Sequence, residues 1–224
     1  MTFASRVLGF FCLDFDFAFD LRTAAFSPIT ERVYVGSRPT LDDVPALAEA
    51  GITHVVSCLE EPALSTMSFL DLSFETLRLP LRDSMDEDIA ATFPTFTRFA
   101  EQTAVVLVHC QVGVSRSATL ATAHLMQAER LTFWDAVSHV RQKRPGILPN
   151  IGFASQLQRL EHALFPEVRP ELSSLARYLR EIANAPVDIE VLQEVLVQHD
   201  FDAPRALRAI FGGEIPRVVQ GARA

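Results

Sequence analysis

Cysteine is scarce in this sequence, and its three cysteines, Cys12, Cys58 and Cys110, lie far apart. None of them stands in C-x-x-C spacing, so the sequence predicts neither a disulfide framework nor a structural zinc site. Widely spaced, unpaired cysteines of this kind are typical of a reducing compartment. We therefore expect a cytoplasmic protein, with access to the nucleus left open.

Long apolar runs and basic charge are also lacking. The one apolar stretch that resembles a targeting segment, residues 7–19, is interrupted by Asp14 and Asp16 and has no small-residue cleavage site. We therefore expect neither a signal peptide nor a membrane span. Lysine and arginine total 20 against 28 acidic residues, and the formal charge of -8 repels nucleic acid and anionic lipid headgroups. Neither is an expected partner.

The residues that are present suit one substantial domain with an appendage. A chain of 224 residues, 49% of them hydrophobic, buries one core but not two full-sized ones. We divide it into an N-terminal extension (1–26), a principal domain (27–166) and a helical extension (167–224). Residues 14–21 alternate acidic or small side chains with apolar ones, a pattern that predicts an edge strand, although a partner-binding segment would show it too.

Strands and helices alternate along the principal domain. Apolar or alternating stretches predict strands at residues 33–35, 52–58, 74–81 and 104–108. Amphipathic stretches predict helices at residues 41–50, 89–102 and 114–129, and two more that begin near Thr132 and Asn150. This alternation predicts an α/β fold with a central, mostly parallel sheet flanked by helices. The continuously apolar strand at 104–108 belongs at its centre.

Beyond Pro166 the composition changes, and prolines separate short amphipathic stretches. They predict a small all-helical C-terminal extension with helices at residues 171–184, 188–199 and 203–211. Amphipathicity alone leaves two interpretations open. The helices either pack against the principal domain or form a module that binds another protein.

The chemistry is concentrated in residues 109–117, HCQVGVSRS, where a hydrophobic strand ends and a long helix begins. A loop at such a junction directs several backbone N–H groups at one point, backed by the positive end of the helix, and this suits a phosphate dianion. We expect a phosphate cradle formed by Gln111, Val112, Gly113, Val114, Ser115 and Arg116. Gly113 would allow the tight turn that this cradle needs.

Cys110 lies at the mouth of this predicted cradle. A lone cysteine is more often a small buried side chain, but the field of the cradle favours a thiolate, which is a nucleophile at neutral pH. Arg116 supplies a planar fork of donors that grips two phosphate oxygens, a geometry that lysine cannot provide. The combination of Cys110, Gly113, Arg116 and Ser117 at fixed spacing predicts nucleophilic attack on phosphorus.

The pattern H-C-x5-R-S resembles the signature of cysteine-based protein tyrosine phosphatases, and HCQVGVSRSAT is similar to their small, atypical dual-specificity subgroup. The resemblance extends from about Ser27 to Phe165 and includes SPITERVYVGS, GITHVVSC, LPLRD and RPGILPNIGF. It implies the cysteine-phosphatase fold and removal of phosphate from phosphotyrosine and from phosphoserine or phosphothreonine in proteins. The implied reaction passes through phosphocysteine and uses no metal or other cofactor.

The resemblance also implies roles for individual residues. Asp83 matches the general acid, with Asp86 and Asp88 as alternatives in the same acidic loop. Ser117 matches the hydroxyl that stabilises the departing Cys110 thiolate, and His109 matches the residue that orders the loop from behind. Asn150 matches a residue that braces the cradle, and it suits a plain helix cap equally well.

The sequence leaves two questions open, the class of substrate and the role of Cys58. The cradle positions around Gly113 carry no formal charge, which favours phosphorylated proteins as partners. A phosphoinositide or other non-protein phosphatase is the alternative, because a Cys–Arg cradle is indifferent to what carries the phosphate. A phosphate-binding scaffold without turnover is a weaker one. Cys58, at the end of a neighbouring predicted strand, is either a core cysteine or a disulfide partner for oxidised Cys110.

Overall fold

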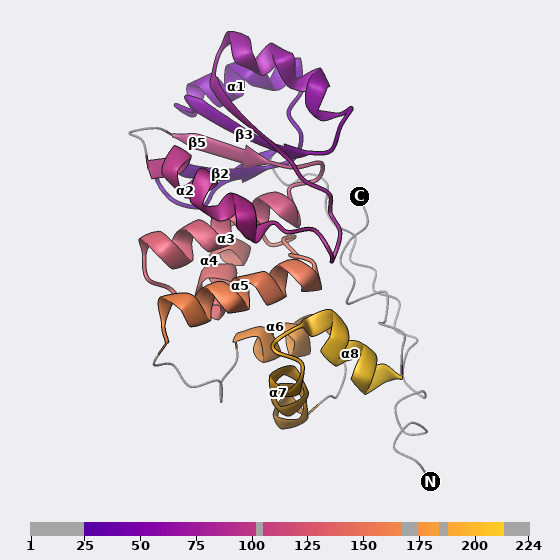
Figure 1. The fold of residues 1–224 in the computed structure, drawn as a ribbon. Coiled ribbons are helices and arrows are strands. Elements are labelled where there is room, and N and C mark those ends of the chain that lie inside the picture. Colours follow the sequence, from indigo (N-terminus) through magenta and orange to yellow (C-terminus); the bar gives the residue numbers. More distant parts are fainter. Residues whose placement is uncertain (1–24, 102–104, 167–173, 184–187, 213–224) are drawn as a thin grey trace.

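The computed structural model describes residues 25–101, 105–166, 174–183 and 188–212. The predicted edge strand at residues 14–21 and the cysteine Cys12 lie outside these ranges. Within the described residues, strands are interspersed with helices up to residue 109, and the rest of the chain forms helices (Figure 1).

A five-stranded sheet forms the centre of the molecule, in the order β1-β2-β5-β3-β4. The strands are β1 (Phe26–Pro28), β2 (Val33–Gly36), β3 (His54–Leu59), β4 (Glu75–Pro80) and β5 (Val106–His109). β5 lies in the middle and pairs in parallel with β2 and β3, and β4 pairs in parallel with β3. Only β1, which pairs with β2, is antiparallel among the described strands. The prediction of a mostly parallel sheet with a central fifth strand is confirmed.

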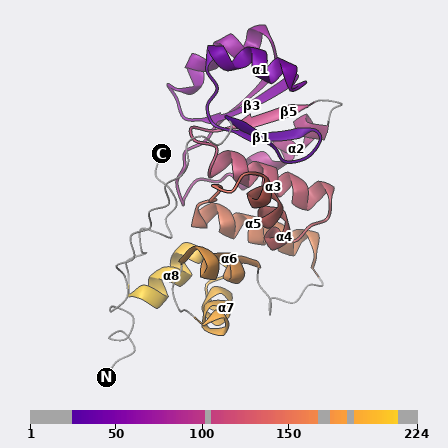
Figure 2. The same ribbon diagram turned by 180° about the vertical axis from the view of Figure 1, so that it is seen from behind.

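Alternate residues of the central strands face opposite layers, which explains why these strands read as continuously apolar. Val56 and Val108 belong to the core beneath α3, and Val55 and Leu107 belong to a smaller core on the other face. The smaller core is covered by α1 (Val44–Glu49), which follows the short η2 (Leu41–Asp43), and by η3 (Leu64–Leu72). The larger one is covered by α2 (Phe93–Glu101), α3 (Arg116–Ala128), α4 (Phe133–Lys143) and α5 (Ile151–Leu164) (Figures 1 and 2).

Local sequence signals set the helix ends. The Thr132 hydroxyl accepts a hydrogen bond from the Asp135 backbone N–H at the start of α4, as its position before the helix predicts. Pro94 lies in the first turn of α2, which follows the short η4 (Ala90–Thr92). Two elements were not predicted. β1 has only three residues, and η3 lacks the apolar periodicity of an amphipathic helix.

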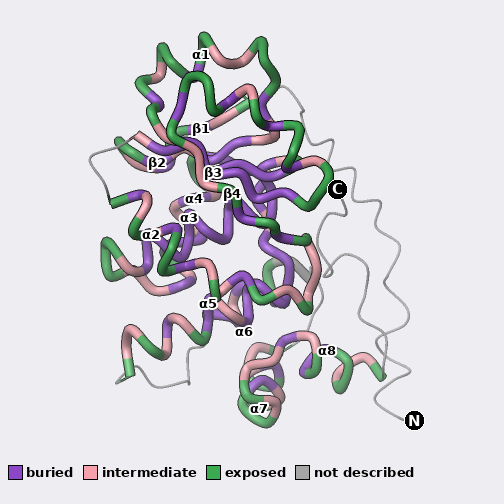
Figure 3. Tube along the Cα trace, turned by 45° about the horizontal axis from the view of Figure 1, so that its top comes forward, coloured by how far each residue is buried: buried purple, intermediate pink, exposed green. Residues whose placement is uncertain are grey.

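The C-terminal extension contains α6 (Ser174–Ala183), α7 (Ile189–Gln198) and α8 (Ala203–Phe211). Side chains of all three helices, including Leu175, Leu196 and Leu207, are buried in the same core as α3 and α5 (Figure 3). Polar contacts fix the arrangement, because the Leu175 N–H donates to Gln158 Oε1 (2.7 Å) and the Ala203 N–H donates to Ser155 Oγ (2.9 Å). The helices thus pack against the principal domain, and binding of another protein stays a prediction. No described helix is both long and apolar enough to cross a bilayer.

Candidate active site

The predicted cradle occupies the turn between β5 and α3. Gly113 has a φ of +76°, and a Cβ at this position would lie 2.6 Å from both the Gly36 carbonyl oxygen and Arg144 Nη2. Only glycine therefore fits. Arg144 is 3% exposed, and its Nε donates to the Gly113 carbonyl (2.9 Å) while Nη2 donates to the Val112 carbonyl (3.3 Å). This guanidinium fixes the outside of the turn.

The Cys110 thiol lies at the base of the turn and is 2% exposed. Its Sγ accepts hydrogen bonds from the Ser117 hydroxyl (3.3 Å) and the Gly113 backbone N–H (3.2 Å). Burial by itself would raise the pKa of this thiol. The hydrogen bonds from Ser117, the charge of Arg116 and the Gly113 N–H outweigh burial and lower the pKa below its ordinary value. These contacts favour the thiolate form of Cys110.

Cys58 has the opposite environment, although it lies next in register after the Ser57–His109 pair of β3 and β5. Burial, and then the nearby charge of Cys110, raise the pKa of the Cys58 thiol well above its ordinary value. The pKa values of Cys58 in β3 and of Cys110 just after β5 are thus shifted in opposite directions, and among the described residues hydrogen-bond donors reach only the Cys110 sulfur.

Arg116 is 4% exposed and begins α3. Its Nη1 donates to the Leu81 carbonyl (3.1 Å), and its Nε lies 3.7 Å from Asp83 Oδ2. That buried Nε–H has no hydrogen-bond partner within the described part of the chain. A buried guanidinium with an unused donor is costly unless an acceptor arrives, and a phosphate oxygen is the acceptor that this turn suits.

Asp83 is the carboxylate that lies against the cradle. Its Oδ1 accepts from the Ser115 hydroxyl (2.8 Å) and from Asn150 Nδ2 (2.9 Å). Asn150 also caps α5, because its Oδ1 accepts from the Phe153 N–H (3.0 Å), and its own N–H donates to Ser115 Oγ (3.2 Å). The two interpretations of Asn150, a brace and a helix cap, therefore describe the same side chain.

The other two acidic candidates make local contacts. The side chain of Asp86 is 75% exposed, accepts from the Ser84 hydroxyl and lies 3.9 Å from Arg82. Asp88 accepts from the Ala91 N–H at 3.3 Å. None of these three contacts involves the cradle, whereas Asp83 is held beside Arg116.

The loop that carries Asp83 is docked on α5. Gln156 donates to the Glu87 carbonyl (2.8 Å) and accepts from the Ala90 N–H (2.8 Å). At Gly152 a Cβ would collide with the backbone of Met85, so the absence of a side chain there permits the close approach. This packing determines where Asp83 lies relative to Cys110.

His109 is fully buried behind the cradle. Its Nε2 lies 2.7 Å from Ser57 Oγ, and its Nδ1 lies 3.4 Å from the Cys110 carbonyl oxygen. A carbonyl only accepts, so Nδ1 carries the proton and Nε2 accepts from Ser57. Burial lowers the pKa of this imidazole to about 4, which keeps it neutral at physiological pH.

Sequence reasoning missed Ser57 and Arg144 as members of the site. Ser57 lies in the predicted strand before Cys58, and Arg144 directly precedes Pro145 in the RPGILPNIGF stretch. A polar residue within a buried strand and an arginine at a helix end were the available signals. Neither indicates its partner, because both partners are far away in the sequence.

A buried thiol in a turn of donors, an arginine and an adjacent carboxylate define the class of cysteine-based phosphatases. The model of the family "Dual specificity phosphatase, catalytic domain" matches residues 33–163, and the chain belongs to this family. It is 33% identical over 150 residues to dual specificity protein phosphatase 19 of Mus musculus, covering 64% of each chain. It is 34% identical over 149 residues, 65% of this chain, to "MAP kinase phosphatase with leucine-rich repeats protein 3" of Dictyostelium discoideum.

The match spans 17% of the Dictyostelium protein, so the chain covers less than two thirds of either relative. Among solved structures, human DUSP28 is similar, with a TM-score of 0.54 and 30% identity over 63% of this chain and 95% of that chain. The predicted resemblance to the dual-specificity phosphatases is therefore confirmed.

Proposed function

We propose that the protein hydrolyses phosphate esters on protein side chains, both phosphotyrosine and phosphoserine or phosphothreonine, through a phosphocysteine intermediate. The observation that carries this proposal is the Cys110 thiol, which accepts from Ser117 and Gly113 close to a buried Arg116 with an unused donor. Membership of the dual-specificity phosphatase family supports it.

In the first step, the Cys110 thiolate attacks phosphorus, a sulfur–phosphorus bond forms and the bond to the substrate oxygen breaks. Asp83 gives its proton to the departing oxygen. Arg116 and the backbone N–H groups of residues 111–116 hold the three equatorial oxygens, so positioning and charge stabilisation supply most of the acceleration.

In the second step, water attacks the phosphorus of phosphocysteine while the Asp83 carboxylate takes its proton. The sulfur–phosphorus bond breaks, inorganic phosphate is released, and the Ser117 hydroxyl stabilises the returning thiolate. Asp83 thus ends the cycle protonated, as it began. The hydrogen bonds from Ser115 and Asn150 to the same carboxylate oxygen leave its other oxygen for proton transfer.

Phosphorylated proteins are the substrate class that the cradle favours. Its side chains other than Arg116 are neutral, whereas a multiply phosphorylated inositol headgroup calls for additional cations. The net charge of -8 also opposes binding to an anionic membrane surface. We place this activity in the cytoplasm, where phosphorylated signalling proteins occur.

The test compares phosphotyrosyl peptides, phosphothreonyl peptides and phosphoinositides in one phosphate-release assay. We expect turnover of both peptide classes by the wild type, none by Cys110→Ser, and retained turnover by the matched control Cys58→Ala. Binding of peptides by Cys110→Ser should persist, because serine is similar in size but far less acidic. Faster release from phosphoinositides than from peptides would contradict the proposal. Binding without turnover by the wild type would favour a scaffold.

A further inference from the structure

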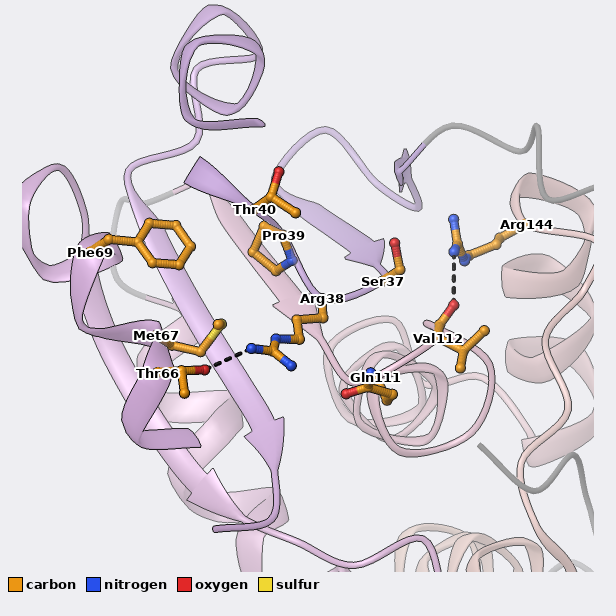
Figure 4. A pocket seen from close by; sticks show the side chains of 10 residues that line it. All are labelled: Ser37, Arg38, Pro39, Thr40, Thr66, Met67, Phe69, Gln111, Val112 and Arg144. Atoms are coloured by element: carbon orange, nitrogen blue, oxygen red, sulfur yellow. Dashed lines mark hydrogen bonds between the residues drawn. The ribbon is translucent and has the colours of Figure 1, made fainter. Parts of the chain in front are cut away.

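A groove of about 600 Å³ lies directly beside the cradle (Figure 4). Four parts of the chain line it: the loop after β2, the helix η3, the first residues of the cradle and Arg144 at the end of α4. Gln111 and Val112 belong to both cradle and groove. The Arg38 backbone N–H donates to the Gln111 carbonyl (3.2 Å), which ties the loop after β2 to the cradle. The groove and the cradle therefore adjoin, within reach of one extended substrate.

The groove has one cationic side chain with spare donors. Arg38 is half-buried, and its Nη2 donates to Thr66 Oγ1 (2.7 Å). Figure 4 shows the Arg38 guanidinium between the η3 wall and Gln111. No described carboxylate forms an ion pair with Arg38. The second cation, Arg144, instead holds the carbonyls of Gly113 and Val112.

The groove also has an apolar side, which is formed in part by η3. The half-buried Phe69 lines it, together with Met67 and Pro39, which are themselves largely buried (Figure 4). A headgroup with several phosphates gains nothing from such a wall. An extended peptide does, because neighbouring side chains of different character emerge along its length.

We propose that this groove is a peptide subsite that selects substrates with an anionic side chain near the phosphorylated residue. The anionic group pairs with Arg38, and an adjacent part of the peptide packs on the half-buried Phe69. The proposal rests on the proposed function, since it requires a phosphopeptide in the cradle. Arg38 can pair with either a carboxylate or a second phosphate ester, because both are anionic hydrogen-bond acceptors. Peptides that carry one or the other show which of the two anions is preferred.

The experiment uses four phosphotyrosyl peptides that differ only in the residues flanking phosphotyrosine, which are alanine, glutamate, phosphoserine or lysine. The readout is kcat/KM for formation of the free tyrosine hydroxyl from each peptide, divided by the value for the alanine peptide and measured within each variant. This ratio cancels any general effect on the cradle. Arg38→Gln and Arg38→Glu are compared with Arg98→Gln, which removes an exposed arginine of α2 that does not line the groove.

For the wild type and Arg98→Gln we expect a preference of about tenfold for at least one of the two anionic peptides, the size expected of one charge-assisted hydrogen bond. Arg38→Gln should reduce the preference to near one, and Arg38→Glu should reverse it in favour of the lysine peptide. Whichever of glutamate and phosphoserine shows the larger effect identifies the natural anion.

An unchanged anionic preference in Arg38→Gln and Arg38→Glu would overturn the proposal. So would a loss of phosphoinositide hydrolysis in Arg38→Gln without any change among the peptides, because the groove would then recognise a lipid headgroup. A different result would contradict the proposed function. In that case the wild type itself would hydrolyse none of the peptides, and the proposed peptide subsite would be rejected as well.

Discussion

The Tyr178 hydroxyl donates a hydrogen bond of 2.6 Å to the carbonyl oxygen of Pro149. Tyr178 is a fully buried residue of α6, and Pro149 directly precedes Asn150, which holds Asp83 and Ser115. The C-terminal extension is therefore connected to the acid loop and the cradle through one residue. This contact makes Tyr178 a positioning residue rather than a catalytic one.

Replacing Tyr178 with phenylalanine keeps the ring and removes this hydrogen bond. We expect the free energy of unfolding to fall by about 1 kcal/mol, and kcat on phosphopeptides to fall up to about fivefold with little change in KM. Ser155→Ala is the control, because it removes a different hydrogen bond to the C-terminal helices. For Ser155→Ala we expect a similar fall in the free energy of unfolding but no loss of kcat. Equal kcat values for both variants would refute the positioning role.

Ser117→Ala tests the cause of the lowered Cys110 pKa. The Ser117 hydroxyl donates to Sγ and stabilises the thiolate, so its removal should raise the pKa of Cys110. Activity requires the thiolate, and the rising limb of the pH profile of kcat/KM should therefore move to higher pH. The pH dependence of the rate at which iodoacetamide alkylates Cys110 should also move to higher pH. An unmoved limb in both measurements would contradict this account.

The burial of neutral His109 should make the free energy of unfolding depend on pH. Its pKa is about 4 in the folded protein, against 6.5 for an ordinary histidine. The unfolded chain therefore binds a proton first as pH falls, and this destabilises the folded state by up to about 3 kcal/mol between pH 6.5 and 4. In His109→Gln this loss is absent, so urea unfolding should show the stability gap between the wild type and the variant shrinking with falling pH. A constant gap would exclude the buried neutral histidine.

Asp83→Asn removes the proposed general acid. We expect phosphopeptide turnover to fall by about a hundredfold or more, and turnover of activated aryl phosphates, whose leaving groups need no proton, to fall much less. The falling limb of the pH profile should also flatten. Asp86→Asn and Asp88→Asn are the controls from the same loop. If one of them loses activity and Asp83→Asn does not, the acid has been assigned to the wrong residue.

Gly152→Ala tests the docking of the acid loop. The new methyl group would collide with the Met85 backbone, so the loop must move away from α5 and carry Asp83 with it. We expect a loss of phosphopeptide kcat between about tenfold and a hundredfold. The control is Gly51→Ala, a glycine with a φ of +75° and open space around it. It should cost about 1 to 2 kcal/mol of stability and leave kcat unchanged.

Much of the fold follows from local sequence signals. Apart from η3, the strands and helices between residues 33 and 164 were predictable because apolar periodicity and helix caps such as Thr132 and Asn150 depend on neighbours in the chain. β1 escaped prediction because three residues show no periodicity. The packing of α6 to α8 could not be decided, because amphipathicity does not indicate which surface covers an apolar face.

The residues of the site also divide into those that local sequence indicates and those that it does not. Cys110, Arg116 and Ser117 lie within one short motif, so their spacing predicts a common function. Tyr178 and Arg144 act through contacts with residues distant in the sequence, Pro149 and Gly113, and no local pattern encodes such contacts. Asn150 was ambiguous in the sequence because capping and bracing use different atoms of the same amide, which only the three-dimensional arrangement separates.

The central position of β5 has a consequence for how the protein acquires a reactive thiol. β5 pairs with β2 and β3, both of which the ribosome makes much earlier, while Asn150 and then Tyr178 emerge after the cradle sequence. Pairing of distant strands is slow compared with the formation of local helices. The donors that lower the pKa of Cys110 are local, but the turn that holds them contacts Gly36, made before it, and Arg144, made after it. We therefore expect the lowered pKa to arise once segments from both sides of Cys110 have assembled.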